Sequence, residues 1–415
     1  MGYLRFLRAN APWLAAGVLL AFLSSFGQTF FIAVFAGEIR AEFGLSHGSW
    51  GLIYTAGTGA SALAMLYAGV LTDRFRARAL GAAVLALLTG ACLVMAAVPA
   101  VWALPVAVFL LRFAGQGMTS HIALVAMARW FVATRGRALS TATMGVAGGE
   151  AFLPLIFVAA MGVFDWRTLW VVAAAVALAG IPVLLALLRR ERLPATMAAE
   201  STATLGMGAA HWTRGAAVRH WLFWCMVPAL LGPPAFNTAF FFQQVHIAEV
   251  KGWAHLDLVA LFPVYTGTSV AAMALSGWAL DRLGTARLMP WFQLPMVGAF
   301  LLLALAPTPA LALPGLVLMA LTTGANATLP NAFWAEFYGT RHLGAIKAMA
   351  AAIMVLGSAV GPGLTGTLID AGLGIETQFL GIATYFVAAS ACMAAGIVRA
   401  APALPQRRFD FLPRD

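Results

Sequence analysis

Charge is scarce in this sequence: 10% of the 415 residues are Asp, Glu, Lys or Arg, whereas 62% are hydrophobic. A soluble domain does not need so large an apolar share, so the composition excludes one. Cys92, Cys225 and Cys392 lie singly in apolar segments, which excludes a disulfide framework. The sequence shows no histidine–cysteine cluster, nucleophile–base pair or nucleotide-binding glycine loop, so we expect no metal, no cofactor and no enzymatic activity.

Long apolar runs fill most of the chain. About 20 helical residues cross the hydrocarbon of a bilayer, so runs of this length predict membrane-spanning helices, whereas a barrel would show short alternating segments. We therefore predict an all-α polytopic membrane protein. About twelve spans are expected near residues 12–35, 50–71, 80–98, 104–127, 138–162, 168–188, 221–245, 257–279, 288–306, 312–335, 346–369 and 377–398.

The formal net charge of +10 is distributed unevenly along the chain. With the N-terminus inside, all Lys and Arg residues except Arg40, Arg112, Arg167 and Lys251 fall in segments predicted to be cytoplasmic. Basic residues favour the cytoplasmic side of a membrane protein, where they contact anionic lipid headgroups. This pattern predicts cytoplasmic N- and C-termini in the inner (plasma) membrane, and it excludes nucleic acid as the partner.

Two short stretches of the sequence are near-copies, 208 residues apart, and each follows a long apolar segment. They share the pattern Gly-x-x-x-Asp-Arg, which comprises Gly69, Asp73 and Arg74 in the first copy and Gly277, Asp281 and Arg282 in the second. The spacing is half the chain, so the sequence reads as two related halves. We expect these loops to gate a conformational change, although they could simply be charges that set the membrane topology.

These loops resemble the signature of the major facilitator superfamily of secondary transporters, with Arg76 in place of the signature's second glycine and Ala279 in place of its leucine. The resemblance implies two six-helix bundles, related by a pseudo-two-fold axis along the membrane normal. The expected domains are 1–188, a cytoplasmic linker over 189–220, a second bundle over 221–398 and a cytoplasmic tail over 399–415. Matching Gly-x-x-x-Gly pairs, Gly145/Gly149 and Gly357/Gly361, predict close helix contacts in each half.

Arg112 is predicted to lie near the middle of the fourth span. Such a charge costs on the order of 3 kcal/mol even on lenient insertion scales, so it should face a cavity or a partner unless it reaches an interface. Gln116 follows one turn later on the same face. The segment from Arg112 to Gly117 also resembles the superfamily's fourth-helix motif, Arg-x-x-x-Gly-x-Gly, although the spacing differs.

Glu150 is the one acidic residue that the sequence places deep in a span. We predict that it is the proton-coupling group and that Arg112 is its electrostatic partner, although Glu150 could instead form a structural hydrogen bond. The glycines Gly136, Gly145 and Gly149 partly resemble the fifth-helix motif of drug antiporters, which continues with proline where this chain has Glu150.

Other polar side chains within or beside spans are candidate substrate ligands. Each could equally form a hydrogen bond between helices. The predicted binding set is Arg112, Gln116, Gln28, Asn237, Gln244, Asn326, Asn331 and Tyr265.

The loop from Trp130 to Leu139 also resembles the monocarboxylate-transporter branch of the superfamily, but the eighth span has no charge before Asp281, where that branch has its arginine. We predict a monomeric secondary transporter of a small organic solute, with an organic anion favoured. It should work by alternating access, coupled to protons as a symporter. The alternatives are a proton-coupled multidrug efflux antiporter and a non-transporting membrane sensor.

Overall fold

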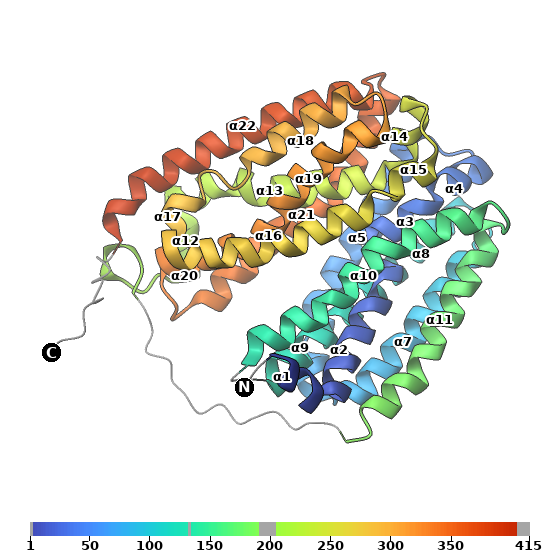
Figure 1. Ribbon diagram of the computed structural model, residues 1–415, viewed down its shortest axis with the longest axis horizontal. Coiled ribbons are helices and arrows are strands. Elements are labelled where there is room, and N and C mark those ends of the chain that lie inside the picture. The colour runs from blue at the N-terminus through green and yellow to red at the C-terminus, as the bar shows by residue number, and fades with distance from the viewer. Residues whose placement is uncertain (1–2, 132–133, 191–204, 405–415) are drawn as a thin grey trace.

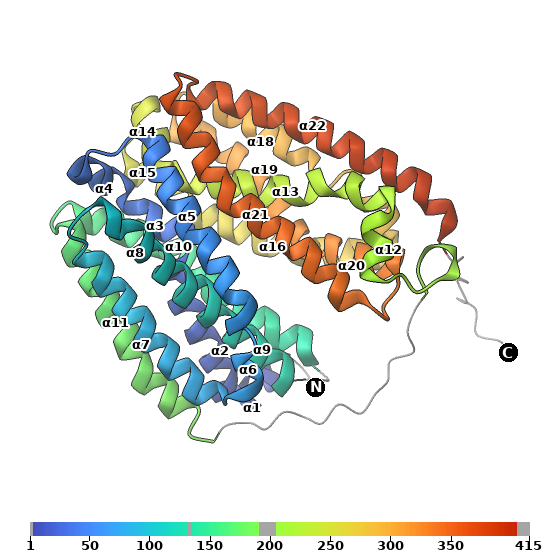
Figure 2. The same cartoon turned by 180° about the vertical axis from the view of Figure 1, so that it is seen from behind.

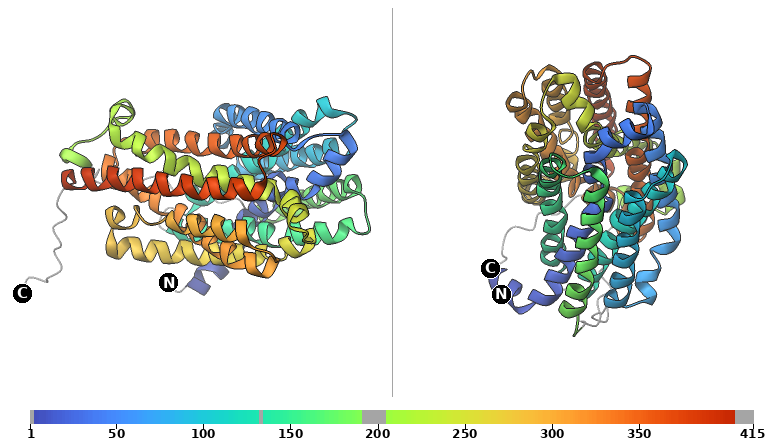
Figure 3. Two further views of the ribbon diagram at one scale, coloured as in Figure 1. Left: turned by 90° about the horizontal axis from the view of Figure 1, so that it is seen from above. Right: turned by 90° about the vertical axis from the view of Figure 1, so that its right-hand side faces the viewer.

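The computed structural model describes residues 3–131, 134–190 and 205–404, and no strand occurs among them. Figure 1 shows the helices gathered into two bundles, one for each half of the chain. Figure 3 shows that the long helices of both bundles follow a broadly common direction. The prediction of an all-α polytopic fold with two six-helix bundles is confirmed.

The first bundle begins with a broken span. Its two arms, Ala11–Gly27 and Thr29–Phe43, meet at 47°. The helices of this bundle are α1 (Tyr3–Ala9), α2 (Ala11–Leu23), η1 (Ser24–Gly27), α3 (Thr29–Ile32), η2 (Ala33–Phe35), α4 (Ala36–Phe43), α5 (His47–Ala68), α6 (Leu71–Arg74), α7 (Ala77–Ala96), η3 (Val101–Ala103), α8 (Leu104–Leu111), η4 (Arg112–Thr119), α9 (Ser120–Trp130), α10 (Arg135–Met161) and α11 (Trp166–Leu187).

The second bundle repeats this arrangement with different breaks. Residues 191–204 of the predicted linker and 405–415 of the predicted tail lie outside the described residues. The remaining helices are η6 (Met207–Ala209), α12 (Arg214–Arg219), α13 (Trp221–Phe242), α14 (Gln244–Lys251), α15 (His255–Val259), α16 (Phe262–Leu283), α17 (Thr285–Leu288), α18 (Leu294–Leu305), α19 (Pro309–Asn326), α20 (Leu329–Tyr338), α21 (Leu343–Asp370), α22 (Ile375–Ala400) and η7 (Ala401–Ala403).

Helices occupy all twelve predicted span ranges, but not all are long and apolar. Among the described residues, nine helices could cross a membrane by length and composition, and the bent first span makes ten. The other two ranges hold α5, which is rich in Gly, Ser and Thr, and α18, which has 12 residues. Polar and small residues in α5 are explained by its position, because it packs against α21 of the other bundle.

The predicted close helix contact in the first half is present where α10 crosses α2. A Cβ atom at Gly145 would lie 2.2 Å from the Val18 carbonyl oxygen, and one at Gly149 would lie 2.0 Å from Ser25 Oγ. These positions therefore require glycine, as the Gly-x-x-x-Gly spacing predicted.

The second half contains the equivalent contact between α21 and α13. A Cβ atom at Gly361 would lie 2.2 Å from the Ala235 carbonyl oxygen, and one at Gly357 would lie 2.7 Å from the Leu231 carbonyl oxygen. The same pair of helices therefore crosses in each bundle, which agrees with the internal repeat.

Gly145→Ala is expected to destabilise the protein by about 1–3 kcal/mol, because an added methyl group would overlap the α2 backbone. Gly148→Ala is the matched control on the same helix, since nothing lies within 4 Å of a Cβ atom there. The melting temperatures of the two purified variants measure the difference. Equal melting temperatures would contradict the close crossing.

Contacts of one cation, Arg167, join three spans at one end of the first bundle. Arg167, at the start of α11, donates to the carbonyl oxygens of Ala96 at 2.7 Å and Val98 at 2.8 Å. It also pairs with Glu42 of α4 at 2.5 Å. The cation thus satisfies free carbonyls at the C-terminal end of α7 and joins the first, third and sixth spans.

The second bundle has equivalent contacts around Lys251, but the cation and the anion have exchanged spans. Lys251, at the end of α14, donates to the carbonyl oxygens of Ala304 at 3.0 Å and Ala306 at 3.1 Å. It also pairs with Glu376 at the start of α22 at 2.7 Å. The cation now comes from the first span of its bundle and the anion from the sixth. Each bundle is therefore braced internally at this end.

The two bundles meet at one end and diverge at the other (Figures 1 and 2). We call the end near α4, α14 and α15 the closed end. The opposite end, which carries the Asp-Arg loops, is called the basic end. At the closed end, Asp370 of α21 accepts hydrogen bonds from Ser46 Oγ at 2.6 Å and from the Gly48 N–H at 2.9 Å. Thr55 Oγ1 also donates across the bundles to the Ala359 carbonyl at 2.7 Å.

Candidate substrate and coupling site

The first span is broken where the fourth span passes it. Gln28 has an extended backbone with ψ of 155° between η1 and α3, and the fourth span forms a π-helix over Arg112–Thr119. A Cβ atom at Gly27 would lie 2.1 Å from the Leu111 carbonyl oxygen, so only glycine allows this approach. Non-helical backbone at membrane depth is tolerated where it is buried in protein or lines a cavity, and the residues of η1 before this break are all buried.

Arg112 is buried at this break, with 3% of its surface exposed. Its Nη1 donates to the Gly27 carbonyl at 3.2 Å and to Thr29 Oγ1 at 3.3 Å. Thr29 Oγ1 in turn lies 2.5 Å from the Tyr54 hydroxyl, and the guanidinium carbon lies 5.4 Å from the Tyr54 ring centre. Arg112 therefore turns inward rather than reaching an interface.

No carboxylate lies within ion-pair distance of Arg112 in the part of the chain that the structure describes. Its Nε is buried and has no hydrogen-bond partner there. A buried cation whose charge is balanced only by neutral dipoles attracts an anion strongly. Gln116, which is half-buried, follows on the π-helix.

Glu150 lies on α10 and bridges the two bundles. Its Oε2 accepts a hydrogen bond from Thr266 Oγ1 of α16 at 2.9 Å. The predicted ion pair between Glu150 and Arg112 is absent from this structure, because each side chain has neutral partners on different helices. Sequence reasoning missed Thr266, whose relevance depends on which helix of the second bundle faces α10.

A second polar cluster lies in the other bundle beside Thr266. Tyr265 donates to Thr323 Oγ1 at 3.1 Å, and Asn237 Nδ2 lies 2.8 Å from the same hydroxyl oxygen. Asn237 Oδ1 is buried and has no hydrogen-bond partner among the described residues. The structure thus brings the predicted residues Asn237 and Tyr265 together, through Thr323, which the sequence analysis did not select.

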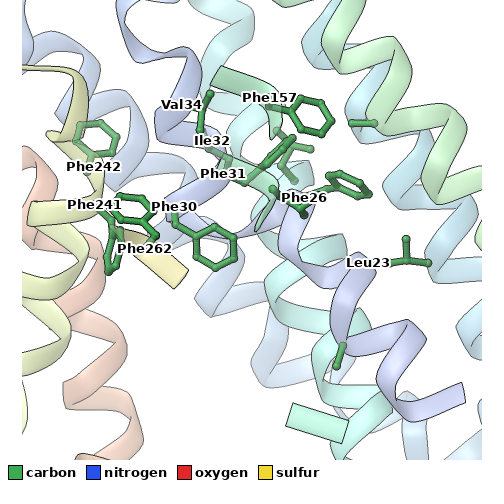
Figure 4. Packing of buried hydrophobic residues seen from close by; sticks show 14 of the residues in the cluster. Leu23, Phe26, Phe30, Phe31, Ile32, Val34, Phe157, Phe241, Phe242 and Phe262 are labelled. Atoms are coloured by element: carbon green, nitrogen blue, oxygen red, sulfur yellow. The ribbon is translucent and has the colours of Figure 1, made fainter. Parts of the chain in front are cut away.

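Aromatic rings pack on both sides of the bundle interface (Figure 4). Phe31 and Phe157 of the first bundle have ring centres 4.8 Å apart, and Phe241 and Phe262 of the second are 5.0 Å apart. Figure 4 places Phe30 between these groups. Two further ring contacts connect this packing to the polar clusters, since Phe242 lies 4.7 Å from the Tyr54 ring centre and Phe241 lies 5.2 Å from that of Tyr265.

The remaining predicted ligands do not share one site. Gln28 is half-buried at the break, and Gln244 instead lies in the seam near the closed end, where its Nε2 donates to the Phe30 carbonyl at 3.1 Å. Asn326 is half-buried at the end of α19, and Asn331 donates to the Ala327 carbonyl at 2.9 Å. Asn331 therefore satisfies a backbone carbonyl where α19 gives way to α20.

The first Asp-Arg loop makes its described contact inside its own bundle. Asp73 pairs with Arg129 at the end of α9, and Arg129 Nη1 also donates to the Thr72 carbonyl at 2.6 Å. Arg74 is exposed, and Gly69 ends α5.

In the second loop, the guanidinium of Arg282 lies 4.1 Å from the Trp278 ring centre. Thr285 nearby donates to Glu336, which occupies the position that matches Arg129 in the repeat. Gly277 and Asp281 lie on the same last turns of α16. Both loops therefore lie at the basic end, with their described contacts inside single bundles.

A family model described as Major Facilitator Superfamily matches residues 17–362. The chain belongs to the major facilitator superfamily. No curated protein sequence matches it. Membership, with the fold above, establishes a membrane transporter rather than an enzyme.

Solved structures of the superfamily share the fold at low sequence identity. A bacterial homolog of the human lysosomal transporter Spinster, inward-facing and unoccupied, superposes with a TM-score of 0.73 at 16% identity. That match covers 96% of this chain and 99% of the other. The nucleoside transporter NupG has a TM-score of 0.66 at 15% identity, with coverage of 92% of this chain and 98% of the other.

Proposed function

We propose that this superfamily member is a proton-coupled symporter of a small organic anion that works by alternating access. The observation that carries the proposal is Arg112, a buried cation without a carboxylate partner among the described residues. Glu150 supplies the titratable group, because it is a carboxyl at membrane depth whose hydrogen bond joins the two bundles. Its protonation state therefore affects both the local charge and the contact between bundles.

Two features favour a transport cycle over the alternative of a non-transporting membrane sensor. The bundles are joined at the closed end and through Glu150 and Thr266, whereas their ribbons diverge at the basic end. The distribution of Lys and Arg favours a cytoplasmic basic end, and hence an inward-facing state of a monomer in the inner membrane. The proposal includes the domain boundaries predicted from the sequence, with bundles over 1–188 and 221–398, a linker over 189–220 and a tail over 399–415.

The multidrug antiporter is the second candidate, because Gly145 and Gly149, which partly resemble the antiporter motif, lie where α10 crosses α2. Arg112 is positively charged, so it would repel an organic cation. The monocarboxylate-like branch is weakened by α16, which has no charged residue before Asp281. The proposal of an organic anion therefore rests on the charge of Arg112 and not on resemblance to the monocarboxylate-transporter branch.

Thermal-shift measurements on the purified protein test the cargo class. Small organic acids should raise the melting temperature, since a ligand at 100 times its Kd stabilises by about 2.7 kcal/mol. Arg112→Lys should weaken this effect because it loses the planar fork that holds a carboxylate. Stabilisation by amphipathic cations but by no acid would favour the antiporter.

Asp73→Asn is expected to lower the transport rate severalfold and leave the amount of folded protein unchanged. The Asp73 side chain is 59% exposed, and a surface ion pair contributes about 0–1 kcal/mol to stability. The rate should fall if Asp73 exchanges Arg129 for a partner on the other bundle when the basic end closes. Initial rates in liposomes for Asp73→Asn and Asp281→Asn measure this effect, and wild-type rates in both would contradict a gating role of the Asp-Arg loops.

A further inference from the structure

Two histidines from different bundles are in ring contact at the closed end. His47, at the first position of α5, and His246, on α14, have ring centres 4.0 Å apart with the planes inclined at 60°. Both lie outside the spans predicted over 50–71 and 221–245. The pair lies in the seam, since a Cβ atom at Gly366 of α21 would lie 2.4 Å from the His47 carbonyl oxygen.

Charged groups from three helices act on this pair. Arg40 comes from α4, Glu249 from α14 and Asp370 from α21, and Gln243 hydrogen-bonds to the His47 side chain. Arg40 acts on both imidazoles, and its Nε is buried and has no hydrogen-bond partner among the described residues. Glu249 lies 4.0 Å from His246, a long contact, and Asp370 is already engaged by Ser46 and Gly48. The two imidazoles are thus in ring contact beside a cation.

We propose that the His47–His246 pair is a proton-sensitive latch, whose protonation separates the two bundles at the closed end. Two imidazolium ions in ring contact, with Arg40 nearby, would repel one another, and parting the bundles would return both rings to water. The carboxylates oppose this only in part, because Asp370 already accepts hydrogen bonds at the α5 N-terminus, and Glu249 lies on the same helix as His246 and accompanies it in both states. The latch rests on the alternating-access part of the proposed function and is independent of the cargo.

The direction of the pH effect follows from which state binds more protons. Burial, then His246 and Arg40, lower the pKa of His47 to about 4. Burial and then Arg40 lower the pKa of His246 as well. Once separated, the rings should titrate near the ordinary value of about 6.5. The open state therefore binds more protons, so closure is favoured above about pH 6.5 and is lost progressively as the pH falls below it.

Distances between spin labels across the seam test the latch. Ala41 of α4 and Val250 of α14 are exposed and come from different bundles, so each can be replaced by a labelled cysteine. Cys225 and Cys392 are replaced by alanine in this background, and buried Cys92 is kept. Between pH 8 and pH 5.5 the ratio of long to short distances should rise on the order of tenfold from His47 alone.

Three variants define the outcome. His47→Gln/His246→Gln should abolish the pH response, and His246→Lys should favour the long distance at both pH values. His342→Gln is the matched control, because His342 is exposed at the basic end, and it should respond like the wild type. A wild-type protein that opens to the same extent at both pH values, or a response that persists in the double variant, would overturn the latch. Failure to populate the long distance under any condition, with or without cargo, would overturn alternating access as well.

Discussion

Glu150→Gln is expected to retain cargo binding and cargo exchange but to lose accumulation driven by a pH gradient. Glutamine keeps the size and the hydrogen-bonding capacity toward Thr266, so the contact between α10 and α16 should survive. It cannot bind or release a proton, so cargo and proton movement are uncoupled. In proteoliposomes with an imposed gradient, the ratio of internal to external cargo should fall to about one, the value set by equilibration alone.

Thr266→Val separates the carboxyl from its cross-bundle hydrogen bond. This variant removes the hydroxyl that contacts Glu150 at 2.9 Å and leaves the carboxyl titratable. It should change the rate of transport and keep gradient-driven accumulation. Unchanged proton-driven accumulation in Glu150→Gln would show that Glu150 is structural, and the protein would then be a uniporter or use another coupling group.

Arg112→Ala is expected to abolish anion transport, with a loss of at least about 100-fold in initial rate. The change removes the buried charge and leaves the Gly27 carbonyl without its described side-chain donor. An unsatisfied buried group costs about 1–3 kcal/mol, so the melting temperature should fall too. Binding and stability must therefore be measured on the same preparation.

Two conservative variants distinguish whether Arg112 recognises the anion or stabilises the broken first span. Arg112→Lys keeps the charge but loses the planar fork, so anion affinity should fall more than stability. Thr29→Val removes one partner of Arg112 and of Tyr54 without removing charge, so stability should fall more than affinity. If Thr29→Val loses as much anion affinity as Arg112→Ala does, Arg112 is a structural clamp. Normal transport by Arg112→Ala would end its assignment to the cargo.

Most helices and two of their close crossings could be predicted from the sequence because their causes are local. Hydropathy marks most spans, and the Gly145/Gly149 and Gly357/Gly361 pairs mark two positions where helices are in close contact. The duplicated Asp-Arg loops predicted the two related bundles. The span count was less secure, because the Gly-, Ser- and Thr-rich α5 is not apolar enough to qualify alone.

The site could be predicted only as a set of candidates. Arg112 and Glu150 stand out because charge at membrane depth is rare, but their partners depend on how distant helices meet. The break at Gln28 follows from the close approach of Gly27 to the fourth span, which no local pattern announces. Thr266 and Thr323 are ordinary hydroxyl residues until the fold places Glu150 and Asn237 beside them. For this reason the sequence suggested an ion pair that the structure does not contain.

Gradient-driven uptake in proteoliposomes tests the central claim most directly. The wild-type protein is reconstituted, an acidic exterior is imposed, and a labelled organic acid chosen from the thermal-shift screen is followed with and without a protonophore. Proton-coupled symport predicts transient accumulation above the external concentration that the protonophore abolishes. Uptake that only equilibrates, with the same rate and extent whether or not the gradient is present, would contradict it.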